Sequence, residues 1–164
     1  MRIGIGYDVH AFADNRDLII GGVTIPYERG LAGHSDADVL LHAIADAILG
    51  ALRAGDIGQH FPDSDAQFKG ADSAKLLAQV GKIAWEQSWT IVDIDSVIVV
   101  QEPKLAPYRD QMRANIAAAL GIAKDSVGVK ATTTEHLGFE GRGEGIAAHA
   151  VVLLECHSGE PTPC

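Results

Sequence analysis

The stretch RIGIGYDVHAF, residues 2–12, alternates apolar residues with small or polar ones. Such alternation is typical of a β-strand, and we predict one over about 2–12. Side chains two positions apart on a strand point to the same side, so Asp8 and His10 should project next to each other. The stretch therefore predicts the first strand and a pair of side chains that could bind a metal. The apolar members are Ile3, Ile5, Tyr7 and Val9, and those between are Gly4, Gly6, Asp8 and His10.

A helix is predicted next, over about 36–52. Its apolar residues recur at helical spacing, and Ser35 followed by Asp38 resembles a capping box. Asp38, His42 and Asp46 are each four positions apart, so they form one polar stripe on this helix. A stripe of this kind is usually a solvated face. Alternatively, the two carboxylates could hold the His42 imidazole from one turn on either side.

The rest of the chain continues the mixture of strands and helices. Pro107 suits the first turn of a helix and Gly121 suits its end. The polar segment 53–73 is predicted as a long loop, and loops of this length in compact domains are usually functional. Strands or strand pairs are predicted at 18–26, 90–101, 127–135 and 144–156, and helices at 73–87 and 106–121.

Two of these predicted strands are apolar on both faces. In 144–156 and in 94–100, apolar residues occupy odd as well as even positions. Strands of this kind are covered on both faces. Three helices can cover only one face of a four- or five-stranded sheet, so we expect a second chain on the other face.

Composition limits the classes of function. The chain has 164 residues, 47% hydrophobic residues and a net charge of −9, which fits one globular domain and disfavours nucleic acid and anionic membranes as partners. The two cysteines, Cys156 and Cys164, form no CxxC pattern, and the first residues lack a signal-peptide core. We therefore expect a cytoplasmic protein with one domain at 1–155 and a flexible tail at 156–164.

The chemistry-bearing residues suggest a metal centre. Asp8, His10 and His42 make a set of two imidazoles and one carboxylate, and catalytic zinc sites keep three such ligands and one open position. Glu135 could bind a hard cation such as magnesium, and the glycine-rich segment 138–145 could approach a phosphate. Lys104 is a candidate phosphate partner or a solvated turn residue.

Eight segments, taken together and in order, resemble the 2-C-methyl-D-erythritol 2,4-cyclodiphosphate synthase family. The match runs from Met1 to about Glu155, and Tyr7 stands where phenylalanine is common. Eight collinear segments are far more specific than any single motif. They are GYDVH, GGVTIP, GHSDADVLLHA, GDIGQHFPDSD, KGADS, QEPKLAPY, KATTTE and GFEGRGEGIAAHAV.

The resemblance implies an α/β fold, an α+β two-layer sandwich in which a mixed β-sheet carries about three helices on one face. Three copies would associate through their sheets as a homotrimer, with active sites between subunits. This agrees with the doubly apolar strands. In some members a central cavity takes an isoprenoid diphosphate, which Arg142 could serve here.

The resemblance also implies the reaction. The substrate would be 4-diphosphocytidyl-2-C-methyl-D-erythritol 2-phosphate, whose 2-phosphate attacks the β-phosphorus, so that CMP leaves and a cyclic diphosphate remains. Because the substrate supplies the nucleophile, catalysis must come from positioning and charge neutralisation.

Site residues follow from the same resemblance. Asp8, His10 and His42 would hold Zn²⁺, and Glu135 would contact a second metal, Mg²⁺ or Mn²⁺. His34 and Thr133 match the catalytic positions that stabilise the transition state. The substrate-binding positions are Asp8, Val9, His10, His34, Ser35, Asp56, Ile57, Gly58, Phe61, Pro62, Asp63, Ser64, Asp65, Val100, Gln101, Glu102, Pro103, Lys104, Leu105, Ala106, Thr132, Thr133, Thr134, Glu135, Phe139 and Arg142.

Two alternatives remain at this point. A zinc-dependent phosphohydrolase acting on a nucleotide diphosphate substrate would share the metal ligands and use water as the nucleophile. A trimeric scaffold with structural zinc is a non-enzymatic alternative, although structural zinc usually has four protein ligands.

Overall fold

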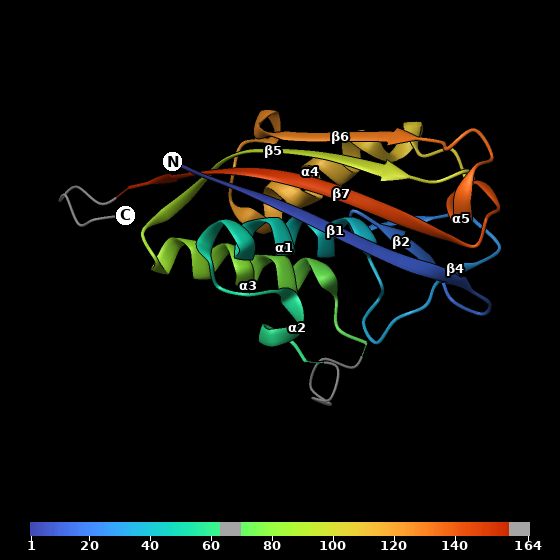
Figure 1. The fold of residues 1–164 in the computed structure, drawn as a ribbon, viewed down its shortest axis with the longest axis horizontal. Coiled ribbons are helices and arrows are strands. Elements are labelled where there is room, and N and C mark those ends of the chain that lie inside the picture. The colour runs from blue at the N-terminus through green and yellow to red at the C-terminus, as the bar shows by residue number, and fades with distance from the viewer. Residues whose placement is uncertain (63–69, 158–164) are drawn as a thin grey trace.

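The computed structural model describes residues 1–62 and 70–157, and these form a five-stranded sheet with helices packed on one face (Figure 1). The strand order is β4-β1-β7-β5-β6. Only β5 and β6 pair in parallel, so the sheet is mixed, as predicted. The strands are β1 (Arg2–Ala13), β4 (Gly30–Leu31), β5 (Trp89–Val99), β6 (Val127–Thr132) and β7 (Gly145–Cys156), and a separate ribbon pairs β2 (Leu18–Ile20) with β3 (Val23–Ile25).

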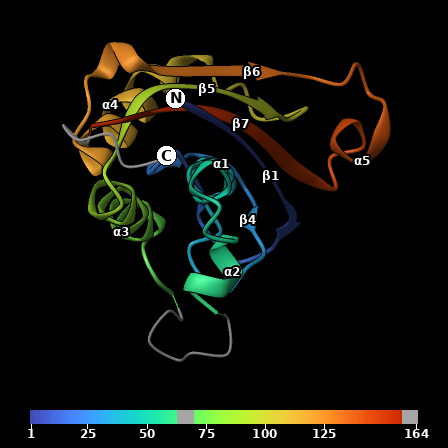
Figure 2. The same ribbon diagram turned by 60° about the vertical axis from the view of Figure 1, so that its left-hand side comes forward.

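Three helices make up most of the second layer, which confirms the predicted two-layer arrangement. Helix α1 (Val39–Leu52) packs on β1 and β7, α3 (Ser73–Glu86) lies beside it, and α4 (Arg109–Leu120) covers β6 (Figure 2). Gly121 ends α4 in a left-handed conformation, as expected. The shorter helical segments are α2 (Ile57–His60), η2 (Ala106–Tyr108), η3 (Lys124–Ser126) and α5 (Gly138–Gly141).

The start of α1 differs from the prediction. Its N-cap is Asp38, whose carboxylate accepts a hydrogen bond from the Leu41 N–H at 3.1 Å, whereas Ser35 lies before the helix. Asp38 is fully buried and also accepts from the N–H groups of Gly21 and Gly22 at 2.9 and 2.7 Å. Burial raises the pKa of this carboxyl to about 6, although the three N–H groups act in the opposite direction.

The stripe of Asp38, His42 and Asp46 is therefore not a solvated face, and that expectation was wrong. Asp46 accepts a hydrogen bond from the Ile57 N–H at 2.7 Å. Each carboxylate is directed at backbone N–H groups of another segment, so the alternative in which both hold the His42 ring was also wrong. Their function in the fold is to attach the β2–β3 turn and α2 to α1.

Glycines set the distance between β1 and α1. A Cβ atom on Gly4 would lie 1.9 Å from the Ala47 carbonyl oxygen, and one on Gly6 would lie 1.9 Å from the Ala43 carbonyl oxygen. Real contacts never come this close, so any side chain at either position would force the strand and helix apart. The glycines of the opening stretch therefore face the core, and its apolar residues face outward.

The outer face of the sheet is apolar over β1 and β7, and no helix of the described residues covers it. Ile3 and Ile5 are each 73% exposed, and Tyr7, Val9 and Val151 are exposed beside them. Ile5 pairs with Val151, and Tyr7 pairs with His149, so these side chains form one contiguous patch across β1 and β7. We call this patch, made of Ile3, Ile5, Tyr7, Val9, His149 and Val151, the outer apolar face.

In residues 1–62 and 70–157, no helix combines the length and the apolar character needed to cross a membrane.

The glycine contact generates the first prediction. Gly6→Ala should lower the free energy of unfolding by about 1–3 kcal/mol or more, because the added methyl group overlaps the helix backbone and the layers must separate. Urea unfolding followed by circular dichroism measures the change.

Gly50→Ala is the matched control. Gly50 is exposed in α1, and a Cβ there would meet its nearest atom, the Ile5 carbonyl oxygen, at an ordinary 3.8 Å. Alanine is the better helix former, so this variant should gain up to about 1 kcal/mol. Equal stability of Gly6→Ala and the parent chain would contradict the proposed packing constraint.

Candidate metal centre and substrate pocket

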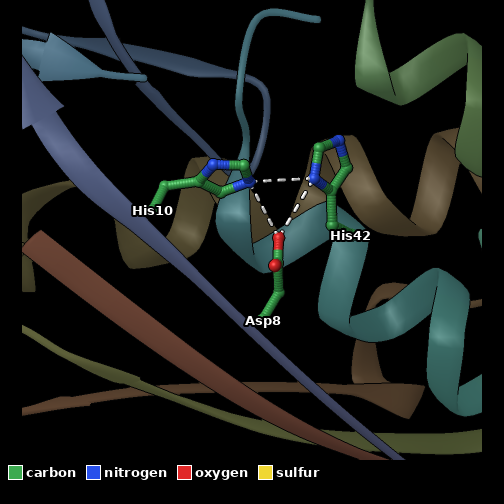
Figure 3. A group of neighbouring side chains, drawn as sticks. All are labelled: Asp8, His10 and His42. Atoms are coloured by element: carbon green, nitrogen blue, oxygen red, sulfur yellow. Dashed lines mark hydrogen bonds and ion pairs between the residues drawn. The ribbon is translucent and has the colours of Figure 1, made fainter. Parts of the chain in front are cut away.

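Three ligand atoms converge between β1 and α1 (Figure 3). Asp8 Oδ2 lies 2.9 Å from His10 Nε2 and 3.1 Å from His42 Nδ1, and the two nitrogens are 3.2 Å apart. Asp8 and His10 reach this point because alternate residues of β1 face the helix layer, as the sequence predicted. His42 reaches it from the first turns of α1, which the glycine contact brings against the strand.

Hydrogen bonds behind the two rings assign their tautomers. The Ala32 carbonyl oxygen lies 2.6 Å from His10 Nδ1, so this nitrogen carries the hydrogen and Nε2 keeps its lone pair. The Ser73 hydroxyl donates to Asp36, so the Nε2 atom of His42, 3.0 Å away, donates to the Ser73 oxygen and Nδ1 keeps its lone pair. Two nitrogen lone pairs and a carboxylate oxygen therefore face one another, which is a favourable arrangement only around a cation.

The spacing fits a small tetrahedral ion. A zinc ion with bonds of about 2.0–2.1 Å keeps its ligand atoms about 3.3 Å apart, close to the observed separations. Two imidazoles and one carboxylate are ligands that zinc takes in catalytic sites, and they leave one position for another group. The residues present therefore fit zinc.

Electrostatics at the centre favour a charged carboxylate. Burial raises the pKa of Asp8, but the neighbouring imidazoles of His10 and His42 outweigh it, and the pKa falls well below its usual range. Burial lowers the pKa of His10, and the neighbouring Asp8 carboxylate more than compensates, so that pKa is raised. In the metal-free protein, a protonated His10 thus interacts favourably with the Asp8 carboxylate, as a bound cation would.

A cavity of about 410 Å³ opens directly onto the three ligands. His34 and Ser35 form one side, and Leu76 adds an apolar wall from α3. The sequence interpretation missed Leu76, because its position fits equally well in the core of a helix. The lining residues are Asp8, His10, Gly33, His34, Ser35, His42, Ile57, Gly58, Phe61, Pro62 and Leu76.

Three polar residues fix the walls of this cavity. The guanidinium of Arg16 donates to the carbonyl oxygens of Gly33 and Ser35, both at 2.6 Å, and so holds the segment that carries His34. The sequence interpretation missed Arg16, which lies in a turn and belongs to no motif. On the other wall, Asp46 holds the first N–H of α2, while Asp56 caps α2 through the Gln59 N–H at 3.0 Å.

A second cavity, of about 210 Å³, lies toward the opposite edge of the sheet, where β6 is the last strand. Lys104 and Leu105 line it from the segment after β5, and Thr132 and Thr133 line it from the end of β6. Glu102, also predicted here, precedes Pro103 in a cis peptide bond and is not among the lining residues. The lining residues are Val100, Gln101, Pro103, Lys104, Leu105, Ala106, Ala131, Thr132 and Thr133.

Glu135 lies beyond this second cavity and not near Asp8, His10 and His42. Its carboxylate accepts a hydrogen bond from the Thr133 hydroxyl at 3.0 Å. Glu135 and His136 both have positive φ, of 53° and 65°, and neighbouring left-handed residues other than glycine are costly and concentrate at functional sites. We predicted a strand that continues to Glu135, but β6 ends at Thr132, so the strand pattern did not indicate this strain.

One chain holds the two cavities apart. Along one row of the sheet, Asp8 pairs with Ala148, Ala148 with Ile98, and Ile98 with Ala131. Three inter-strand steps of about 4.8 Å separate Asp8 from Ala131 by about 14 Å.

The remaining predicted substrate-binding positions are also dispersed. Val9 points to the outer apolar face, away from Asp8. Phe139 lies in α5, and Thr134 donates its hydroxyl hydrogen to the Leu137 carbonyl oxygen. Arg142 Nε contacts Glu144 Oε1 at 2.6 Å, an ion pair that raises the pKa of Arg142 and lowers that of Glu144. The predicted contacts Asp63, Ser64 and Asp65 lie outside the described residues.

Comparison with known proteins supports one family. The model of the YgbB family matches residues 1–155. The 2-C-methyl-D-erythritol 2,4-cyclodiphosphate synthase of Geobacter metallireducens is 65% identical over 155 residues, which are 94% of this chain and 99% of that protein. A solved 2C-methyl-D-erythritol-2,4-cyclodiphosphate synthase in a CDP-bound form has a TM-score of 0.86 at 32% identity, covering 94% of this chain and 100% of that one. The bifunctional IspDF of Campylobacter jejuni has a TM-score of 0.91 at 45% identity, covering 94% of this chain but 42% of that longer one.

The link between Asp46 and α2 generates the second prediction. Asp46→Ala leaves the Ile57 N–H without its acceptor and should lower the free energy of unfolding by about 1–3 kcal/mol. Asp46→Asn keeps an acceptor oxygen and should be as stable as the parent chain or more so at pH 7. Urea unfolding in the presence of a metal chelator measures both differences.

The advantage of Asp46→Asn should depend on pH. Burial raises the pKa of Asp46 above its unfolded value of 3.8, so the protonated form is favoured on folding. The stability that proton binding adds is complete below pH 3.8 and is lost as the pH rises through the higher folded pKa. The asparagine variant should therefore gain on the parent chain from pH 4 to pH 7, and a constant difference would contradict this assignment.

Proposed function

The chain belongs to the YgbB family, and we propose that it converts 4-diphosphocytidyl-2-C-methyl-D-erythritol 2-phosphate to 2-C-methyl-D-erythritol 2,4-cyclodiphosphate. The observation that carries the proposal is a three-ligand metal centre facing an open cavity, in a chain that is 65% identical to a synthase over nearly its full length. The enzyme is a phosphorus–oxygen lyase. An oxygen of the 2-phosphate bonds to the β-phosphorus, the bond from that phosphorus to the bridging oxygen breaks, and CMP leaves with that oxygen.

The metal centre supplies charge neutralisation. Asp8, His10 and His42 hold Zn²⁺, which acts as a Lewis acid toward phosphate oxygens when bound. His34 and Ser35 stand next to these ligands on a segment that Arg16 fixes, so they are placed to contact the same phosphates. Rigid placement is what an intramolecular attack requires, because the rate depends on holding two groups of one molecule together.

The first cavity suits the methylerythritol unit. Ile57, Phe61 and Leu76 offer apolar surface to a methyl group and a carbon chain. Its volume of about 410 Å³ is in the range of small-molecule sites. Asp56 is exposed at the start of α2. Its carboxylate caps the helix and has further lone pairs that can accept hydrogen bonds from hydroxyl groups.

The second cavity suits the cytidine and α-phosphate. Lys104 brings a cation, and the hydroxyl groups of Thr132 and Thr133 can donate to phosphate oxygens. Glu135, held by Thr133, would contact the second metal, Mg²⁺ or Mn²⁺, which prefers carboxylate oxygen. Thr133 lines this cavity and also donates to Glu135, which supports the catalytic role proposed for it.

We propose a homotrimer that joins these half-sites. Asp8 and Ala131, which line the first and the second cavity, are about 14 Å apart along the sheet of one chain, so the first cavity of one subunit would meet the second cavity of its neighbour. The outer apolar face supports association through the sheets, because exposed apolar patches mark interfaces. A site for an isoprenoid diphosphate at the three-fold axis and a cytoplasmic location stay predictions.

Product analysis tests the reaction, and this is the third prediction. The zinc-loaded protein, given the substrate and Mg²⁺, should release CMP and the cyclic diphosphate in equal amounts. Phosphorus NMR detects both products. Treatment with a chelator should abolish both products. A linear diphosphate as the sole product would contradict the proposal and indicate the phosphohydrolase.

Assembly provides the fourth prediction. Ile5→Glu places a charge in the centre of the outer apolar face, and it should convert an assembly of three chains to single chains as measured by native mass spectrometry. Turnover should fall with the trimer, since the half-sites separate. Ala78→Glu adds the same charge on the exposed side of α3 and should leave three chains together. A trimer that survives Ile5→Glu would contradict association through this face.

A further inference from the structure

A chain of hydrogen bonds continues behind His42, on the side of the ring away from the other ligands. His42 Nε2 lies 3.0 Å from the hydroxyl oxygen of Ser73, and the Ser73 hydroxyl donates a short hydrogen bond to the Asp36 carboxylate. Ser73 is 1% exposed and is the first residue of α3. No sequence motif pointed to either Asp36 or Ser73 as part of the metal centre.

The donors and acceptors in this chain have one consistent direction. The Asp36 carboxylate is an acceptor, and it also takes the N–H of Ser73 at 3.1 Å and that of Asp38 at 3.3 Å. The Ser73 hydroxyl hydrogen is therefore committed to Asp36, which leaves its oxygen as an acceptor. His42 Nε2 must then supply the hydrogen, and Nδ1 keeps the lone pair that faces Asp8.

Ser35 is a weaker candidate for the same task. Its hydroxyl oxygen lies 3.3 Å from His42 Nε2, which is longer than the distance from Ser73. The Ser35 oxygen already accepts the Ala37 N–H at 3.1 Å, and the residue lines the open cavity. Ser73 is enclosed and its hydrogen is fixed by a carboxylate, so it is the better-defined acceptor.

We propose that Ser73 and Asp36 are positioning residues of the metal centre. They fix the tautomer and the ring orientation of His42, and the carboxylate behind the hydroxyl makes Nδ1 a stronger donor to zinc. The Ala32 carbonyl has the same function behind His10. The inference rests on the proposed zinc centre and extends it to two residues outside the ligand set.

The same residues couple the centre to the cavity wall. The backbone N–H of Asp36 donates to the Ala71 carbonyl at 3.1 Å, and that of Gly70 donates to the His34 carbonyl at 2.8 Å. The segment that carries His34 is therefore tied to the residues that lead into α3. Through Ser73, the orientation of a zinc ligand and the position of this wall depend on one hydrogen-bonded unit.

Zinc affinity is the direct test, and it supplies the fifth prediction. Zn²⁺ alone is titrated into the full-length apoprotein in competition with a fluorescent chelator. Ser73→Ala should weaken zinc binding by about 10–100-fold, because the His42 ring loses its acceptor. Asp36→Asn, which can still accept one hydrogen bond, should weaken it by about 10-fold.

Two serine controls isolate the role of the hydroxyl. Ser96 is also buried, and its hydroxyl donates to the Gly128 carbonyl at 2.8 Å on β5, away from the centre, so Ser96→Ala should leave zinc affinity unchanged. Ser35→Ala should weaken zinc binding by less than Ser73→Ala. A larger loss for Ser35→Ala would overturn the assignment to Ser73.

A spectroscopic readout separates orientation from general stability. In the zinc-loaded parent chain, the His42 Nε2–H should give a slowly exchanging proton signal by nitrogen-edited NMR, and Ser73→Ala should lose it. If both Ser73→Ala and Asp36→Asn bind zinc within twofold of the parent chain, the inference is overturned and the zinc centre stands. If the parent chain itself fails to bind zinc, both the proposed function and this inference are overturned.

Discussion

The absence of side chains at Gly4 and Gly6 is the constraint on which the rest of the molecule depends. Each glycine lies against a carbonyl oxygen of α1, so that strand and helix touch through their backbones. Ala43, Ala47 and Ala51 on the helix make the approach possible from the other side, because they are small. Asp8 and His10 lie on the same face of β1 as the two glycines. His42 comes directly before Ala43, which contacts Gly6. The metal centre is therefore a direct consequence of how closely this strand and helix pack.

The same constraint determines what lies on the other face of β1. Because glycine and the ligands occupy the inner positions, the apolar residues Ile3 and Ile5 must point outward. An amphipathic strand normally turns its large apolar side chains to its own core, and here it exposes them. The inner face of β1 thus carries the candidate metal ligands, and the proposed trimer would bury its outer face. An enzyme whose substrate spans two cavities can use that association to complete its active site.

Local patterns in the sequence were sufficient for the long elements, since periods of two and of about 3.6 residues persist over ten or more positions. The pairing of Asp8 with His10 followed from the same reasoning, whereas the approach of His42 depended on the glycine contact, which no local pattern contains. Asp38 shows where such reasoning fails. Its spacing suggested a solvated stripe, but its surroundings are set by Gly21 and Gly22 from a distant turn. The role of Arg16 and the left-handed conformation of Glu135 were missed for the same reason, because each depends on tertiary contacts.

The acidic groups around the first cavity explain why a cation is needed there. Asp36, Asp38 and Asp46 are each directed at N–H or hydroxyl groups of the protein, and their carboxylates organise the walls of the site. Hydrogen bonds of this kind stabilise a carboxylate without removing its charge, so the walls remain negative toward a substrate that carries several phosphate charges. The N–H groups of α2 and the side chain of Arg16 offset only part of that potential, and Arg16 is already engaged with carbonyl oxygens. A divalent ion held by Asp8, His10 and His42 would reverse the sign of the potential at the point where the phosphates must meet. The carboxylates thus shape the pocket, and the proposed metal ion would offset their negative charge so that an anionic substrate can bind.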